Sequence, residues 1–144
     1  MRVDIEQVSS YDDEEALIKA VELTDEIKSA IDILENNRRV VPVISDGKTV
    51  MCRADLIYYI ESVDKRTYVY TREGCYETRY RLYELEDQLN YYFLRCSKAM
   101  IINIRKIKSV KAELNGRMIA DLLNGEQITI SRGYVKELKG KLGV

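Results

Sequence analysis

The stretch NGRMIADLLNGEQITISRGYVKELKGKL (residues 115–142) decides the fold class of this chain. Its two Asn-Gly pairs are strong hairpin signals, because a tight turn between paired strands needs residues that accept positive φ. The apolar side chains around both pairs are spaced as in short strands. Three successive strands are therefore predicted, over residues 106–114, 117–123 and 126–131.

Residues 132–142 change to helical spacing. Ser131 precedes them and is a candidate N-cap, since its hydroxyl can accept a hydrogen bond from the first turn. The predicted C-terminal helix has one apolar face. This face is made by Tyr134, Val135, Leu138 and Leu142.

The chain between residue 38 and this region also consists mainly of short apolar segments with turn signals between them. The pattern predicts a helix over 82–89, and residues 99–104 fit a strand or a buried turn. Pro42 is expected on an edge strand, because proline cannot donate to a sheet. The other predicted strands cover 40–44, 49–52, 56–63, 67–71, 75–80 and 91–95.

Residues 1–37 form a different segment. Residues 2–8 alternate polar and apolar side chains and predict a strand, whereas 16–23 fit a strand or a helix. Thr24 can cap a helix that ends near Asn37. The apolar stripe of that helix is Ile27, Ala30, Ile31 and Leu34. The sequence thus predicts a small α/β N-terminal extension (1–37) before a mainly β domain (38–144).

The net charge of −1 hides an asymmetry between these two parts. Residues 1–37 hold 3 basic and 11 acidic side chains, a net charge of −8. Residues 38–144 hold 20 basic and 13 acidic side chains, a net charge of +7. An acidic head before a basic body indicates nucleic-acid contact by the body.

Several function classes find no support in the composition. The chain has no His, and its three Cys are far apart in the sequence, so a Ser-His-Asp triad and most zinc sites are excluded. No Gly-rich phosphate loop is present, and the carboxylates lack a partner base. We expect no enzyme, no cofactor and no small-molecule substrate. Neither an apolar run of ~18 residues nor a signal peptide is found, which predicts a cytoplasmic protein.

Tyrosine makes up eleven of the twelve aromatic residues. Interleaved tyrosines and basic residues can stack on single-stranded bases. Most of these tyrosines lie at strand spacing, however, so packing within the sheets is the favoured interpretation.

Four stretches together resemble the LytTR-type DNA-binding domain of bacterial transcriptional regulators. They are DLIYYIESVDKRTYVYT (55–71), YRLYELEDQL (80–89), YYFLRCSKAMIINIRKIKSV (91–110) and residues 115–142, so that the resemblance covers about 40–142. It implies a mainly β body of about ten short strands in small antiparallel sheets with short helices. It also implies a homodimer on repeat half-sites of double-stranded DNA, with loops inserted into successive major grooves.

The resemblance places the DNA-contacting residues in three loops. In loop order they are Lys65, Arg66 and Thr67; Arg95, Ser97 and Lys98; and Arg132 with Lys136 one turn further. Arg132 would read a base, and its planar fork suits guanine O6 and N7. Asn103 is expected to order a local turn. Ser97 and Thr67 depart from larger side chains common in the family, which gives DNA shape a greater part in recognition.

The predicted function is a sequence-specific transcriptional regulator that binds double-stranded DNA. A receiver domain of about 120 residues does not fit before residue 38, so phosphorylation control is not expected. Short family members often act with a small membrane-protein regulator, and the resemblance implies such a partner here. The alternative is a protein-interaction module or antagonist of another regulator that binds DNA weakly. The stripe on the first helix either mediates dimerisation or docking, or packs on the body.

Overall fold

The computed structural model describes residues 1–36, 39–89 and 92–144. The predicted boundary between residues 37 and 38 lies outside them. Ten strands are present in this described part, all paired antiparallel, and they confirm the mainly β prediction. No helix found there is both long and apolar enough to cross a membrane.

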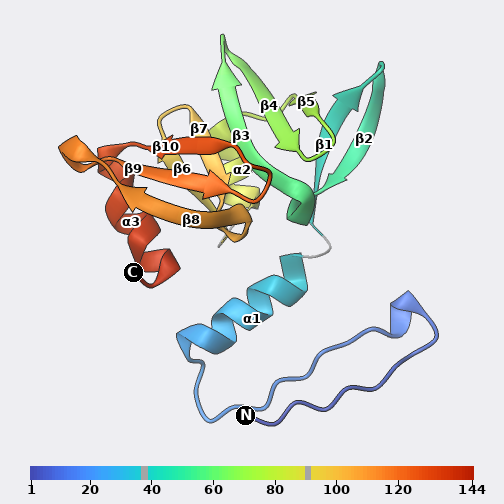
Figure 1. The fold of residues 1–144 in the computed structure, drawn as a ribbon. Coiled ribbons are helices and arrows are strands. Elements are labelled where there is room, and N and C mark those ends of the chain that lie inside the picture. The colour runs from blue at the N-terminus through green and yellow to red at the C-terminus, as the bar shows by residue number, and fades with distance from the viewer. Residues whose placement is uncertain (37–38, 90–91) are drawn as a thin grey trace.

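The larger sheet has the strand order β2-β1-β5-β4-β3-β7-β6 (Figure 1). Its strands are β1 (Val40–Ser45), β2 (Lys48–Arg53), β3 (Ile57–Val63), β4 (Arg66–Thr71), β5 (Cys75–Thr78), β6 (Phe93–Ser97) and β7 (Met100–Asn103). The second sheet has the order β10-β9-β8. It consists of β8 (Ile107–Ala112), β9 (Met118–Leu122) and β10 (Gln127–Ile130).

Among the described residues, three α-helices accompany the sheets: α1 (Asp25–Asn36), α2 (Leu82–Gln88) and α3 (Arg132–Leu142). Short 3-10 turns occur at η1 (Tyr11–Asp13), η2 (Ala54–Leu56), η3 (Ile104–Lys106) and η4 (Leu114–Gly116). The helices and strands predicted after residue 38 are present, and residues 99–104 contain a strand rather than only a turn. Ser131 precedes α3 as predicted, but its side chain makes no capping hydrogen bond.

Two hydrophobic cores lie on opposite faces of β3 and β7. Ile57, Ile60 and Ile101 belong to the first core, with α2, whereas Tyr58 and Ile102 belong to the second, with α3 and the small sheet. Burial on both faces explains why β3 is a continuous apolar run rather than an alternating one. The strand tips are thereby fixed between two packed layers.

The tyrosines within the sheets pack, as the favoured interpretation predicted. Tyr59 and Tyr70 stack with ring centroids 4.3 Å apart. The Tyr59 hydroxyl donates a 2.7 Å hydrogen bond to Glu126. Burial and this carboxylate raise the pKa of Tyr59, and burial raises the pKa of Tyr70 to about 12.

Pro42 does not lie on an edge strand, because β1 has β2 on one side and β5 on the other. Its carbonyl accepts a 2.8 Å hydrogen bond from the Thr78 hydroxyl of β5. In an antiparallel strand the amide and carbonyl of one residue point the same way. The missing amide therefore faces β5, which pairs with β1 only at Ile44.

The described part of the N-terminal extension, residues 1–36, contains α1 but no strand. Figure 1 shows residues 1–23 running out and back below α1 in two extended stretches. Residues 2–8 were predicted as a strand, but no neighbouring strand in the described chain satisfies their backbone, and Ile5 is 88% exposed. A lone extended segment is not a stable sheet element.

The helix α1 begins as predicted, and the Ile27 amide donates to the Thr24 hydroxyl at 3.3 Å. Its Ile33 packs on the first core of the body. The Tyr92 hydroxyl also donates to the Ser29 carbonyl at 2.8 Å. Leu34 of the predicted stripe remains 49% exposed. The other three stripe residues, Ile27, Ala30 and Ile31, are partly buried.

Candidate nucleic-acid interface

The β3–β4 turn presents Lys65 and Arg66. Asp64 and Lys65 have φ values of 50° and 66°, so this is a two-residue hairpin turn with both central residues in the left-handed region. The Lys65 carbonyl accepts a 3.1 Å hydrogen bond from Arg81, a residue that the sequence analysis did not single out. Lys65 and Arg66 are exposed, and Arg66 lies 3.9 Å from Glu77.

Thr67 does not belong to this surface. It lies on β4, opposite Ser62 of β3 and Thr78 of β5, and only 3% of it is exposed. The alternation of side chains along a strand turns Thr67 inward when Arg66 points outward. In this structure Thr67 therefore offers almost no surface to a ligand.

The β6–β7 turn presents Lys98. Within it the Ser97 hydroxyl accepts a hydrogen bond from the Ala99 amide at 3.3 Å. Arg95 points back and binds both the Glu86 carboxylate at 3.0 Å and the Lys98 carbonyl at 2.6 Å. Its side chain is 19% exposed, so Arg95 braces the turn, whereas Lys98 is exposed.

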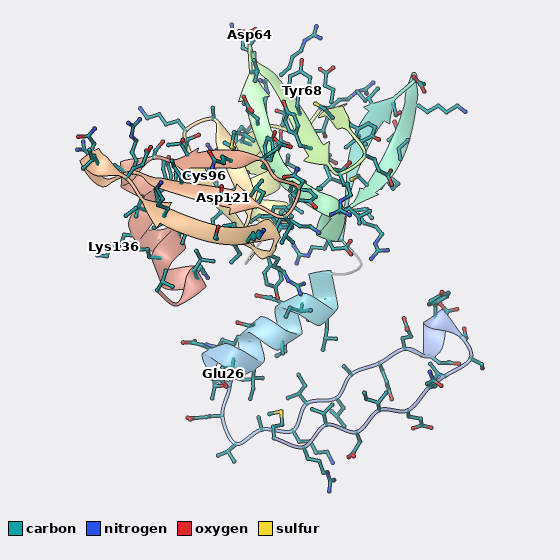
Figure 2. The ribbon with its side chains drawn as sticks, in the orientation of Figure 1. Glu26, Asp64, Tyr68, Cys96, Asp121 and Lys136 are labelled. Atoms are coloured by element: carbon teal, nitrogen blue, oxygen red, sulfur yellow. The ribbon has the colours of Figure 1, made fainter. Side chains whose placement is uncertain are left out.

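The first turn of α3 presents Arg132, which is exposed. Its aliphatic part lies against Gly116 of the β8–β9 turn, where an added Cβ would stand 2.9 Å from Arg132 Cδ. Gly116 also has a φ of 77°. Its lack of a side chain thus leaves room for Arg132. Lys136 is exposed one helical turn further along α3 (Figure 2).

Two backbone hydrogen bonds join the three turns. The Ser62 amide donates to the Ala99 carbonyl at 2.8 Å and links the β3–β4 turn to the β6–β7 turn. The Ser131 amide donates to the Cys96 carbonyl at 2.8 Å and links the end of β6 to the start of α3. Residues far apart in the sequence thereby form one row of neighbouring turns. We call these three segments, 64–66, 97–99 and 131–132, the turn row.

Cys96 lies beneath the turn row. It is 1% exposed, and burial raises the pKa of its thiol to about 12. The thiol stays protonated and packs in the second core. All three cysteines are free, and the described residues contain no group of three or more acidic or Cys side chains placed to hold a metal.

Asn103 orders a local turn, as predicted. It is 2% exposed, its side-chain amide donates to the Ile57 carbonyl at 2.8 Å, and its oxygen accepts from the Arg105 amide at 3.0 Å. These bonds fix the start of η3 against β3. Asn103 therefore supports the sheet from inside rather than contacting a ligand.

The family of the LytTr DNA-binding domain matches residues 47–143. The chain belongs to the LytTR family. An HTH-type transcriptional regulator of Staphylococcus aureus is 28% identical over 145 residues, which cover 99% of this chain and 95% of that protein. The S. aureus transcriptional regulatory protein LytR is 32% identical over 116 residues, covering 80% of this chain and 47% of LytR.

A solved LytTr DNA-binding domain from Bacillus cereus matches with a TM-score of 0.69 and 27% identity. The match covers 74% of this chain and 99% of that domain. The fold predicted from the LytTR resemblance is thus confirmed, and the chain is a member of a DNA-binding transcriptional regulator family. The partner class of this family is double-stranded DNA.

Proposed function

We propose that this LytTR protein binds specific double-stranded DNA sites and inserts the turn row into successive major grooves. The observation that carries the proposal is the pair of backbone hydrogen bonds, Ser62–Ala99 and Ser131–Cys96, which holds three basic turns side by side. Turns fixed relative to one another can meet a duplex together without a large cost in ordering. Phosphate neutralisation by these turns gives salt-dependent affinity.

The residues have separate roles in this proposal. Arg132 reads a base, because its guanidinium fork is exposed while Gly116 and α3 restrain its stem. Lys65, Arg66, Lys98 and Lys136 contact phosphates or bases. Arg95 and Ser97 position the β6–β7 turn through their own hydrogen bonds. Thr67 has no part in the contact.

The test is a footprint on genomic DNA, followed by gel shifts at several salt concentrations. Arg132→Ala should cost roughly 1–3 kcal/mol of binding and relax specificity at one position. Lys65→Ala should weaken all sequences about equally and reduce the salt slope by about 1. Lys139→Ala is the matched control, because it removes a positive charge from an exposed position two turns along α3. Equal losses for Arg132→Ala and Lys139→Ala would contradict the base-reading role.

The second candidate is an interaction module or antagonist that pairs with another regulator and binds DNA weakly. Its support is that three of the eight expected DNA-contacting side chains are engaged or covered within the chain: Arg95 and Ser97 make hydrogen bonds, and Thr67 is buried. The same gel shift distinguishes the two functions. Absence of a salt-sensitive shift on any DNA would favour this second candidate.

We further propose that the protein acts in the cytoplasm as a homodimer on repeat half-sites. Control would be exerted through residues 1–37 by a small membrane-protein regulator rather than by aspartyl phosphorylation. The exposed apolar side chains of this extension support a docking role. Sedimentation with and without operator DNA tests the dimer. Incubation with a phosphoryl donor should leave both the mass of the protein and its DNA affinity unchanged.

A further inference from the structure

We infer that residues 2–8 of one copy add a strand to the outer edge of β2 in a second copy. This inference specifies the dimer proposed above and therefore depends on that part of the proposed function. The same exchange in the opposite direction gives a closed twofold dimer. Three features of the described chain support it: an open edge, an apolar groove beside that edge, and an unpartnered extended segment.

The open edge is β2, the outermost strand of the larger sheet. Pro42 of β1 directs its carbonyl toward β5, and it stands opposite Met51 of β2. Pro42 and Met51 therefore form a pair that exchanges no backbone hydrogen bonds, and the backbone groups of both residues point away from the space between β1 and β2. The amide and carbonyl of Met51 therefore point outward from the sheet. Such a row of backbone groups is a template for another strand.

The groove lies beside this edge and has a volume of about 570 Å³. Its lining includes Val50 and Met51 of β2, Leu56 and Leu123. These four side chains are 46–56% exposed, which is unusual for a cluster of large apolar residues. Val50 and Met51 point to opposite faces of β2, so the apolar side chains of an added strand would cover Val50 and the groove on one face, while Met51 lies on the other.

The segment 2–8 has the pattern such a strand requires. Val3 and Ile5 share one side and are 75% and 88% exposed, and Asp4 and Glu6 occupy the other side. No described strand pairs with this segment in its own chain. Figure 1 shows it below α1, while β2 stands at the upper right of the body. Ile33 and Tyr92 attach α1 to the body, and this attachment holds the segment away from the β2 edge of its own chain. The partner that we infer is therefore the β2 edge of a second copy.

Charge favours this pairing over contact between two heads. Each head (1–37) carries a net charge of −8, whereas each body (38–144) carries +7. Lys48 and Arg53 lie at the two ends of β2, and Arg72 and Lys106 line the groove. Arg53 is paired with Asp55 at 2.6 Å, and Glu73 also lines the groove, so Lys48, Arg72 and Lys106 supply most of the attraction. Two heads in contact would instead repel each other.

Cross-linking between two distinguishable full-length chains tests the contact. Both chains carry Cys52→Ser and Cys75→Ser, and buried Cys96 is left in place. One chain carries Ile5→Cys and the other, with a size tag, carries Val50→Cys. We expect a short bis-maleimide to join the two different chains. Val144→Cys replaces Ile5→Cys as the control, because Val144 is also an exposed terminal residue, at 73%.

Three outcomes would overturn the inference. One is a cross-link between two Ile5→Cys chains with none to Val50→Cys. Another is a cross-link within a monomer that carries both substitutions. The third is an equal yield with the Val144→Cys control. The first outcome identifies head-to-head pairing, and the second identifies docking of the head on its own body.

Sedimentation provides the second measurement. Ile5→Asp should raise the dissociation constant of the dimer at least about tenfold, because a charge replaces an apolar contact, while Val144→Asp leaves it unchanged. Thermal melting verifies that both variants fold. A wild-type chain that stays monomeric overturns the inference even if it binds its operator. A dimer with the predicted cross-link that binds no DNA overturns the proposed DNA-binding function and leaves the inference standing.

Discussion

Replacing Gly116 by Ala should displace the residue that we propose reads a base. The added Cβ would stand 2.9 Å from Arg132 Cδ and 3.0 Å from Cγ, whereas ordinary contacts begin at 3.4 Å. The arginine stem must therefore move by about half an ångström or change rotamer. The guanidinium lies beyond these atoms, so it moves with them.

The substitution also has a backbone cost, because Gly116 has a φ of 77°. An L-residue in the left-handed region costs about 1–2 kcal/mol, which lowers the melting temperature by about 2–8 °C for a chain of this size. Gly125→Ala is a matched control for this cost. Gly125 has a φ of 89° in the β9–β10 turn, but no atom of the described residues lies within 4 Å of its added Cβ.

The assay is a gel shift on the footprinted operator together with thermal melting. Both variants should lose similar stability. Gly116→Ala should also bind the operator about fivefold or more weakly, since a bidentate base contact is worth about 1–3 kcal/mol. Gly125→Ala should bind within about twofold of the wild type. Equal DNA affinity for the two variants would refute the idea that Gly116 positions Arg132.

Three other predictions concern buried or braced residues. Asn103→Ala leaves a buried carbonyl and a backbone amide without these partners. Urea unfolding should therefore show a free energy of unfolding lower by about 2–3 kcal/mol. A decrease below about 0.5 kcal/mol would contradict the role assigned to Asn103. Burial raises the pKa of the Cys96 thiol from its ordinary value near 9 to about 12 in the folded chain. The unfolded chain therefore loses this proton first. The free energy of unfolding should fall between pH 9 and 12, by roughly 1 kcal/mol at pH 10, and more steeply than in Cys96→Ala. Arg95→Ala should lower DNA affinity with almost no change in salt slope, whereas Lys98→Ala should reduce that slope by about 1; equal slope changes would make Arg95 a phosphate contact.

Local signals in the sequence were sufficient for most elements of the body. The Asn-Gly pairs fixed two hairpins, and helical spacing placed α2 and α3. These signals act between residues a few positions apart, so they do not depend on how distant segments of the chain pack. The wrong predictions concern residues whose strand pairing depends on a segment that is distant in sequence. Pro42 has β5 beside it, and residues 2–8 lack any strand beside them.

The candidate site likewise has features that the sequence predicted and features that depend on tertiary contacts. The sequence, through its resemblance to a known family, identified the three loops and Arg132. It could not identify the inward face of Thr67, the bonds of Arg95 to Glu86 and the β6–β7 turn, or the support that Arg81 gives to Lys65. Each of these depends on contacts across separate strands or helices, which no spacing rule within one segment reports.

Turn chemistry, side-chain alternation and composition are local properties, so the family, the strand pattern and the opposite charges of head and body could be read from the amino acids alone. Only the tertiary structure decided which turns meet. The bonds Ser62–Ala99 and Ser131–Cys96 join segments 37 and 35 residues apart into one row. Packing of two cores on opposite faces of β3 and β7 holds that row in place, since both layers must be assembled before the tips are aligned.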